Sequence, residues 1–142
     1  MVMLNAFLAL AAGFVLIAGL VALIELALKK LTPGWEGADD RPPAAYRFVN
    51  LGASFLAAAA GGYVTALVAG SNPLIHVLVL GIVVLALGAL SALQSHGSQA
   101  KSAEVPKPAG RAPVSYTLAL VALRPLGVLA GGILRLRVLG IL

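Results

Sequence analysis

Residues 4–28 read LNAFLALAAGFVLIAGLVALIELAL, and this stretch decides the fold class. Its only charged residue is Glu25, and the basic pair Lys29-Lys30 follows its end. A helix of this length, at ~1.5 Å per residue, is long enough to cross a hydrocarbon core of ~30 Å. A cleaved signal peptide fits less well, because no basic segment precedes the run and a Lys pair stands where small residues would be needed for cleavage. We therefore predict a transmembrane helix over 4–28.

Three further apolar runs of spanning length follow, over 48–70, 73–93 and 114–134. Inside a bilayer every peptide group must bond within the protein, so only helices and closed barrels cross it. Barrel strands alternate apolar and polar residues, whereas these runs are uniformly apolar. The sequence predicts an all-α integral membrane bundle of four transmembrane helices that forms one domain over 1–142.

The segments between the runs carry the signals of chain reversal. We predict loops over 29–47, which contains Pro42-Pro43, and over 94–113, which is rich in Ser, Gly, Pro and Lys. Ser71-Asn72-Pro73 combines N-cap residues with a proline suited to the first helical position, so the second and third helices should form a tight hairpin. The end, 135–142, is predicted to lie along the membrane interface.

Composition supports lipid as the main partner of this chain. Hydrophobic residues make up 61% and charged residues 11%, and the mean hydropathy is +1.02. Such a chain would expose a continuous apolar surface in water. The formal net charge is +5, but the basic residues lie between and at the ends of the apolar runs, which indicates headgroup contact rather than nucleic-acid binding. We expect no cofactor, and the sequence contains no cysteine.

The distribution of basic residues also predicts an orientation. With four spans, the two long loops share one side of the membrane, and both termini share the other with the short hairpin. The loop side holds seven basic residues: Lys29, Lys30, Arg41, Arg47, Lys101, Lys107 and Arg111. The other side holds Arg135 and Arg137. The positive-inside rule then places both long loops in the cytoplasm.

The second run has the clearest pattern of small residues. Every fourth position is small in one row: Ser54, Ala58, Gly62, Ala66 and Gly70. The neighbouring row is also small: Ala53, Ala57, Gly61, Thr65 and Ala69. Gly127 and Gly131 repeat the spacing in the fourth run. Small faces let helices approach closely in lipid, and two uses are open, a homo-oligomer interface or, favoured here, packing within one bundle.

Three titratable residues lie within the apolar runs and are candidates for an intramembrane polar site. Arg124 precedes Pro125 near the middle of the fourth run, where an arginine costs ~2.5–3.5 kcal/mol on insertion scales. It can pair with Glu25, or it can extend along its own helix while Glu25 pairs with Lys29. His76 follows the hairpin, where a stabilising hydrogen bond is favoured over a proton relay. Thr65 can bond between helices.

The sequence gives little sign of catalysis. It contains no nucleophile elbow, no phosphate loop and no set of residues at metal-ligand spacing, so we expect neither an enzyme nor a metal site. One short sequence occurs twice, as Ala60-Gly61-Gly62 in the second run and as Ala130-Gly131-Gly132 in the fourth. Some transporters are built from duplicated units, so this similarity raises the hypothesis of an internal repeat.

The stretch Gly61-Gly62-Tyr63-Val64-Thr65, followed by Pro73-Leu74-Ile75-His76, resembles small bacterial four-helix membrane proteins of unknown function. Those proteins similarly carry a Gly-Gly-Tyr second helix and a Pro-Leu-x-His third helix. The resemblance covers about a quarter of the chain. It implies a multi-pass protein of the bacterial inner membrane and no particular activity.

Two functions are compatible with these observations. The first, which the sequence favours, is a structural or accessory membrane protein that associates, with itself or with another membrane protein, through its small-residue faces. The second is a small transporter or channel component that uses Arg124 and Glu25. The position of Arg124 discriminates between them, because only the second function requires it to face a polar cavity between helices.

Overall fold

The computed structural model describes residues 1–31, 44–101 and 114–141, and these form four helices. They are α1 (Val2–Leu31), α2 (Ala44–Val68), α3 (Pro73–Lys101) and α4 (Val114–Val138). No strand occurs in these three stretches. The predicted all-α class is confirmed, and each helix contains a segment long and apolar enough to cross a membrane. The predicted loops over 29–47 and 94–113 lie mostly outside the described residues, and their described parts, 29–31, 44–47 and 94–101, are helical rather than loop.

The largest differences from the predicted helix ends occur at three places. α2 begins at Ala44, directly after Pro42-Pro43, rather than at residue 48. α3 begins at Pro73 as predicted and continues to Lys101. The first half of the predicted interfacial tail is part of α4, which continues through Arg135 and Arg137 to Val138. Arginine is a good helix former, and a cation is favoured in the last turn of a helix.

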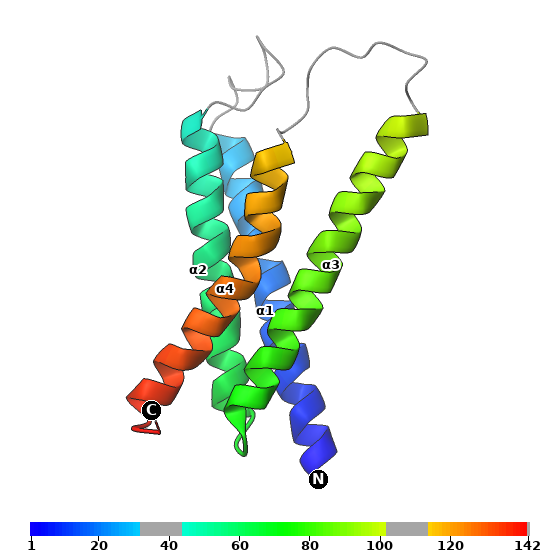
Figure 1. The fold of residues 1–142 in the computed structure, drawn as a ribbon. Coiled ribbons are helices and arrows are strands. Elements are labelled where there is room, and N and C mark those ends of the chain that lie inside the picture. Colours follow the sequence, from blue (N-terminus) through cyan, green and yellow to red (C-terminus); the bar gives the residue numbers. More distant parts are fainter. Residues whose placement is uncertain (32–43, 102–113, 142) are drawn as a thin grey trace.

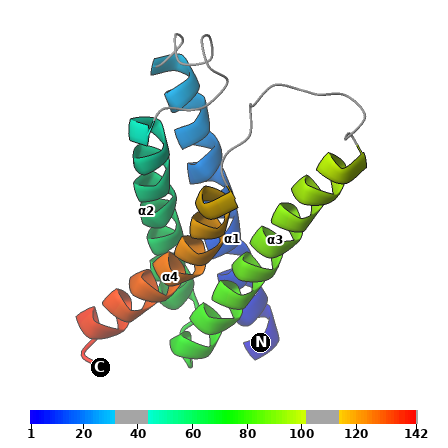
Figure 2. The same cartoon turned by 45° about the horizontal axis from the view of Figure 1, so that its top comes forward.

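The four helices run alternately up and down, and the two ends of the bundle differ (Figure 1). The termini lie at one end with the α2–α3 hairpin, while α1 and α2 are joined at the opposite end, as α3 and α4 are. α4 changes direction near its middle, where Pro125 removes a backbone hydrogen bond. Figure 2 shows α3 inclined to α2, so that the two helices are close at the hairpin and apart toward the loop end.

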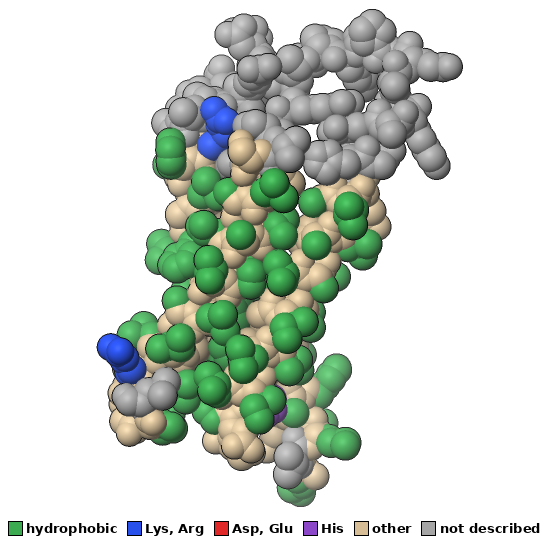
Figure 3. Space-filling view, viewed as in Figure 1, with side chains coloured by type: hydrophobic (Ala, Val, Ile, Leu, Met, Phe, Trp, Pro, Cys, Tyr) green, Lys and Arg blue, Asp and Glu red, His purple; other side chains and the backbone are tan. Residues whose placement is uncertain are grey.

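Bulky and small side chains are distributed with the bulky ones outside. Leucines, valines, isoleucines and phenylalanines of all four helices are exposed, and on the face seen in Figure 3 they extend along the whole length, with Lys and Arg near its ends. The buried side chains are mostly small: Ala9, Ser54, Ala57, Ala58, Thr65, Ala66 and Ala69 among them. An apolar exterior around a small-residue interior is stable when lipid surrounds it.

The closest contact in the bundle joins α2 and α4. A Cβ built on Gly62 would overlap the carbonyl oxygen of Val128, and one built on Gly131 would overlap that of Ala59. At Gly127 the added atom would lie 2.7 Å from the carbonyl oxygen of Phe55. The two backbones therefore touch, which only glycine allows at these three positions. Ser54, Ala58 and Ala66 are buried in the same row of α2.

The neighbouring row of α2 faces α1 instead. A Cβ on Gly61 would overlap the side chain of Ile17, and one on Gly13 would overlap Oγ1 of Thr65. The Thr65 hydroxyl donates a hydrogen bond of 3.3 Å to the carbonyl oxygen of Ala9, so the predicted inter-helix bond of Thr65 is confirmed. The two small rows of α2 thus contact two different helices of the same bundle.

Gly70 does not share the packing role predicted for its row. α2 ends at Val68, and Gly70 is exposed with φ +63° and no atom within 4 Å of an added Cβ. Asn72 also has a positive φ, 50°, which asparagine tolerates better than most residues. These two left-handed residues reverse the chain, so that Pro73 starts α3 as the sequence predicted. The packing row of α2 stops one turn earlier, at Ala66.

The pairs Gly61-Gly62 and Gly131-Gly132 show that the α1–α2 half of the chain is not related to the α3–α4 half by a rotation. In α2 the first glycine of the pair faces α1 and the second faces α4, whereas in α4 Gly131 faces α2 and Gly132 faces Val77 of α3. Successive residues point about 100° apart. The reversed order therefore places α1 and α3 on the same side of the α2–α4 pair, whereas a rotated repeat would place them on opposite sides. The shared Ala-Gly-Gly sequence is therefore a local similarity and does not reflect an internal repeat.

The α2–α4 contact predicts contrasting effects of the same substitution at two glycines of α2. Gly62→Ala should lower the free energy of unfolding by about 2 kcal/mol or more, because the new methyl group forces two backbones apart. Gly52→Ala is the matched control, since an added Cβ there meets nothing within 4 Å, and it should stabilise α2 by up to ~1 kcal/mol. Unfolding in mixed micelles, followed by circular dichroism, measures both. Equal effects of the two substitutions on the free energy of unfolding would show that α2 and α4 do not make this close contact.

Candidate functional site

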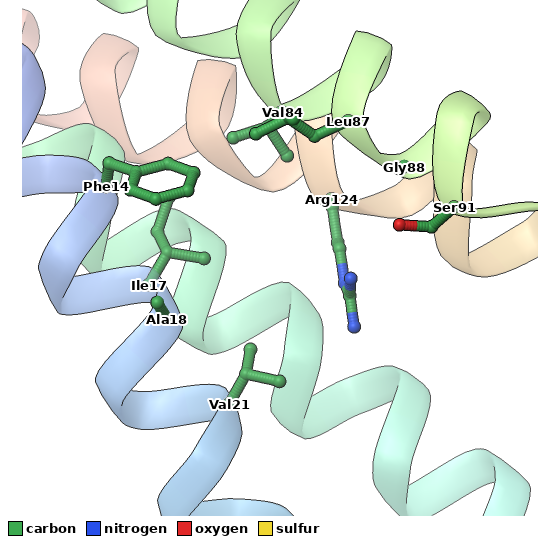
Figure 4. Close-up of a pocket in the computed structure, with 9 residues that line it drawn as sticks. All are labelled: Phe14, Ile17, Ala18, Val21, Val84, Leu87, Gly88, Ser91 and Arg124. Atoms are coloured by element: carbon green, nitrogen blue, oxygen red, sulfur yellow. The ribbon is translucent and has the colours of Figure 1, made fainter.

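A cavity of about 200 Å³ lies between α1 and α3, and Arg124 of α4 extends into it (Figure 4). α1 contributes Phe14, Ile17, Ala18 and Val21, and α3 contributes Val84, Leu87, Gly88 and Ser91. The lining is apolar apart from the Arg124 guanidinium and the Ser91 hydroxyl. One cation in an otherwise apolar cavity is the most distinctive chemical feature of the described chain.

The packing of α4 determines the direction of Arg124. Residues four apart lie on the same face of a helix, so Arg124 shares a face with the buried Val128, and Gly131 and Gly132 continue that face. This face contacts α2 and α3. α1 and α4 make no direct contact along their described lengths, and the guanidinium extends into the space between them. Arg124 thus faces a cavity between helices, as the second function requires, but this cavity is mainly apolar and Glu25 does not line it, so the predicted polar site of Arg124 and Glu25 is not formed.

The guanidinium of Arg124 is incompletely satisfied. Its Nε is buried and has no hydrogen-bond partner among the described residues. Arginine is always protonated, and its side chain has hydrogen-bond donors but no acceptors. An N–H group without an acceptor in an apolar cavity therefore costs free energy of folding. Arg124 lies seven residues from the loop-side end of the spanning segment Thr117–Val138, which is ~10 Å along the helix. The charge therefore lies well inside the membrane segment.

A second partly buried arginine of α4, Arg135, also has a buried Nε without a hydrogen-bond partner among the described residues, but its guanidinium has an aromatic neighbour. The guanidinium carbon of Arg135 lies 5.6 Å from the ring centre of Tyr63 on α2. A cation over an aromatic face is stabilised by the ring quadrupole. The contact between Arg135 and Tyr63 was not predicted from the sequence. The available signal was that Arg135 lies eleven residues after Arg124 and therefore on the same helix face. No such ring contact occurs at Arg124 in the described chain.

Glu25 and His76 lie outside the cavity. Glu25 is exposed on α1, one turn beyond Val21, the last cavity-lining residue of that helix. His76 is at the opposite end of the bundle, where its Nδ1–H donates a hydrogen bond of 3.0 Å to the carbonyl oxygen of Asn72. The hairpin-stabilising hydrogen bond that we favoured for His76 is confirmed. Of the three titratable candidates, Arg124 alone lines the cavity.

The cavity offers chemistry for binding an anion. A guanidinium presents parallel N–H donors that match the two oxygens of a carboxylate or phosphate. Low polarity around the charge strengthens that interaction relative to water. In the described residues no group of three or more His, Cys, Asp or Glu side chains is placed to hold a metal ion.

Removing the charge at Arg124 should stabilise the bundle. In Arg124→Leu an apolar side chain replaces an incompletely bonded cation, and the free energy of unfolding should rise by about 1–3 kcal/mol. Arg137→Leu is the control, because Arg137 is exposed near the end of α4 and its loss should change stability by ~0.5 kcal/mol or less. Unfolding in mixed micelles compares the three proteins. A less stable Arg124→Leu would assign Arg124 a structural role.

Comparisons with known proteins leave this site without a counterpart. The chain matches no protein-family model, no curated protein and no solved structure.

Proposed function

We propose that this chain is a small multi-pass membrane protein that binds an anionic group inside the bilayer at Arg124, as a carrier or channel component does. The observation that carries the proposal is the position of the Arg124 guanidinium in the α1–α3 cavity, because a buried Nε without a partner is shared with Arg47 and Arg135. An intramembrane charge that lines a cavity marks ligand or ion sites in membrane proteins. Binding, rather than catalysis, is the activity proposed.

The energetics favour a functional reason for the arginine. Leucine or methionine would fill part of the cavity and remove the cost of a buried donor. Proteins retain destabilising groups mainly at sites where function uses them. An anion held by the guanidinium would satisfy the donors and neutralise the charge, so the site is most stable when it is occupied.

A structural or accessory role through the small-residue faces has less support. Gly62, Gly127 and Gly131 are occupied by contacts within the bundle, and the row containing Gly61 packs on α1. A partner helix would have to bind the bulky outer surface. Self-association through the glycine faces therefore lacks an available surface in the described chain.

The membrane and the orientation are also proposals. The basic residues at the loop end of the bundle favour that end in the cytoplasm. The resemblance in the second and third helices favours the bacterial inner membrane. With this orientation, Arg124 lies closer to the cytoplasmic end of its helix than to the opposite end.

Anion binding predicts ligand-dependent stability. In neutral detergent at constant ionic strength, replacing sodium gluconate by sodium acetate or sodium chloride should raise the thermal unfolding midpoint of the wild type. A ligand at ten times its Kd adds about 1.4 kcal/mol to the free energy of unfolding. Gluconate serves as the reference anion because its hydroxyl groups would lose their water without finding hydrogen-bond partners in the apolar cavity.

Two variants control for nonspecific effects of the anions. Arg124→Gln should lose the response, whereas Arg135→Gln, which removes the other partly buried arginine of α4, should retain it. Thermal scans followed by circular dichroism give the readout. A response to neither anion in the wild type, or an equal response in Arg124→Gln, would refute binding at Arg124.

A further inference from the structure

We infer that the ligand of the Arg124 cavity is a single-chain carboxylate amphiphile that enters sideways from the bilayer, between α1 and α3. This inference rests on the proposed anion binding and adds the ligand class and the route. Its two parts follow from separate observations, the opening of the cavity and the chemistry of its lining.

The cavity opens on the lipid-facing side of the bundle. Phe14 of α1 and Leu87 of α3 both line it, and their side chains are 40% and 43% exposed. Ala18 of α1, another lining residue, is also exposed. α1 and α3 make the least extensive of the helix–helix contacts, and α3 leans outward toward the loop end. All these residues belong to spanning segments, so the opening faces hydrocarbon rather than water.

The lining dictates a ligand with one negative charge. Arg124 supplies a single positive charge, and the described lining contains no second cation. A carboxylate balances that charge and accepts two parallel hydrogen bonds from the guanidinium. A phosphate monoester would bring up to two negative charges, and the second would remain uncompensated in an apolar cavity. Charge balance therefore favours a carboxylate head group.

The rest of the lining dictates an apolar chain. Around Arg124 the cavity wall consists mainly of Ile17, Val21 and Val84 with the exposed side chains at the opening. An apolar cavity of ~150 Å³ is enough to hold benzene, so the larger volume here accommodates a carboxylate and the first carbons of a chain. The remaining chain would pass between Phe14 and Leu87 into the surrounding lipid. A hydrophilic anion would leave this apolar surface unused.

Photolabelling of the full chain tests this ligand class directly. The protein is reconstituted into nanodiscs of zwitterionic lipid and illuminated with a diazirine-bearing long-chain carboxylic acid, and labelled peptides are identified by mass spectrometry. The acid should label the α1 and α3 peptides that contain Phe14 and Leu87. Labelling by the acid should fall about tenfold or more in Arg124→Gln and persist in Arg124→Lys. The corresponding alcohol should label both variants at the same low level.

A second pair of variants tests the route. Ala18→Trp places a large side chain at the opening and should reduce labelling by the acid. Ala27→Trp adds the same bulk on the opposite face of α1, nine residues away, and should leave labelling unchanged. Circular dichroism confirms that both variants remain helical. Equal labelling in these two variants would overturn lateral entry.

The outcomes separate this inference from the function on which it rests. If acetate or chloride stabilises the wild type through Arg124 but the acid does not label the cavity, anion binding stands and the amphiphile is excluded. If a phosphate-headed single-chain lipid labels as strongly as the acid, the carboxylate preference is overturned. If no anion of any kind acts through Arg124, both proposals fail.

Discussion

The backbone contact between α2 and α4 is the constraint on which the rest of the bundle depends. Lipid provides no hydrophobic force between helices, so close van der Waals packing must hold them together. Gly62 and Gly131 allow this by bringing each helix against a carbonyl group of the other. Once the two helices touch, the remaining helices can only pack on their flanks. The adjacent glycines, Gly61 and Gly132, determine which flanks α1 and α3 occupy.

The cavity is a consequence of that arrangement. α1 and α3 lie on the same side of the α2–α4 pair, but α1 does not reach α4 in the described chain. The space left between them is filled in part by Arg124, and the bend at Pro125 lies next to it. A cavity and a charge at the same depth are therefore linked through the packing of α4. Because of this linkage, the packing that creates the cavity also directs the guanidinium into it.

Much of the architecture could be predicted from the sequence because lipid imposes strong constraints on composition and length. Four apolar runs, the hairpin at Pro73 and the small rows of α2 all have a single physical explanation in a bilayer. The partner of each small row could not be predicted, since a glycine face has no chemical preference among apolar neighbours. The possible pairing of Glu25 with Arg124 could not be judged from the sequence for a similar reason. The sequence indicates how deep each residue lies along its helix, but not how α1 is rotated about its own axis relative to α4. Gly70 fell outside the packing row because two left-handed residues ended α2 early.

The position of Arg124 is decided by its neighbours rather than by its own preference. An arginine in a membrane helix is most stable when its side chain extends along the helix to the interface, which requires a lipid-facing position. Arg124 lacks that option because it lies on the same face as Val128 and Gly131, and the α2–α4 contact holds this face inward. A shift by one residue would turn the side chain by about 100° and release it. The glycine contacts therefore both build the bundle and keep the guanidinium directed into the cavity, where an anion is the group best suited to satisfy it.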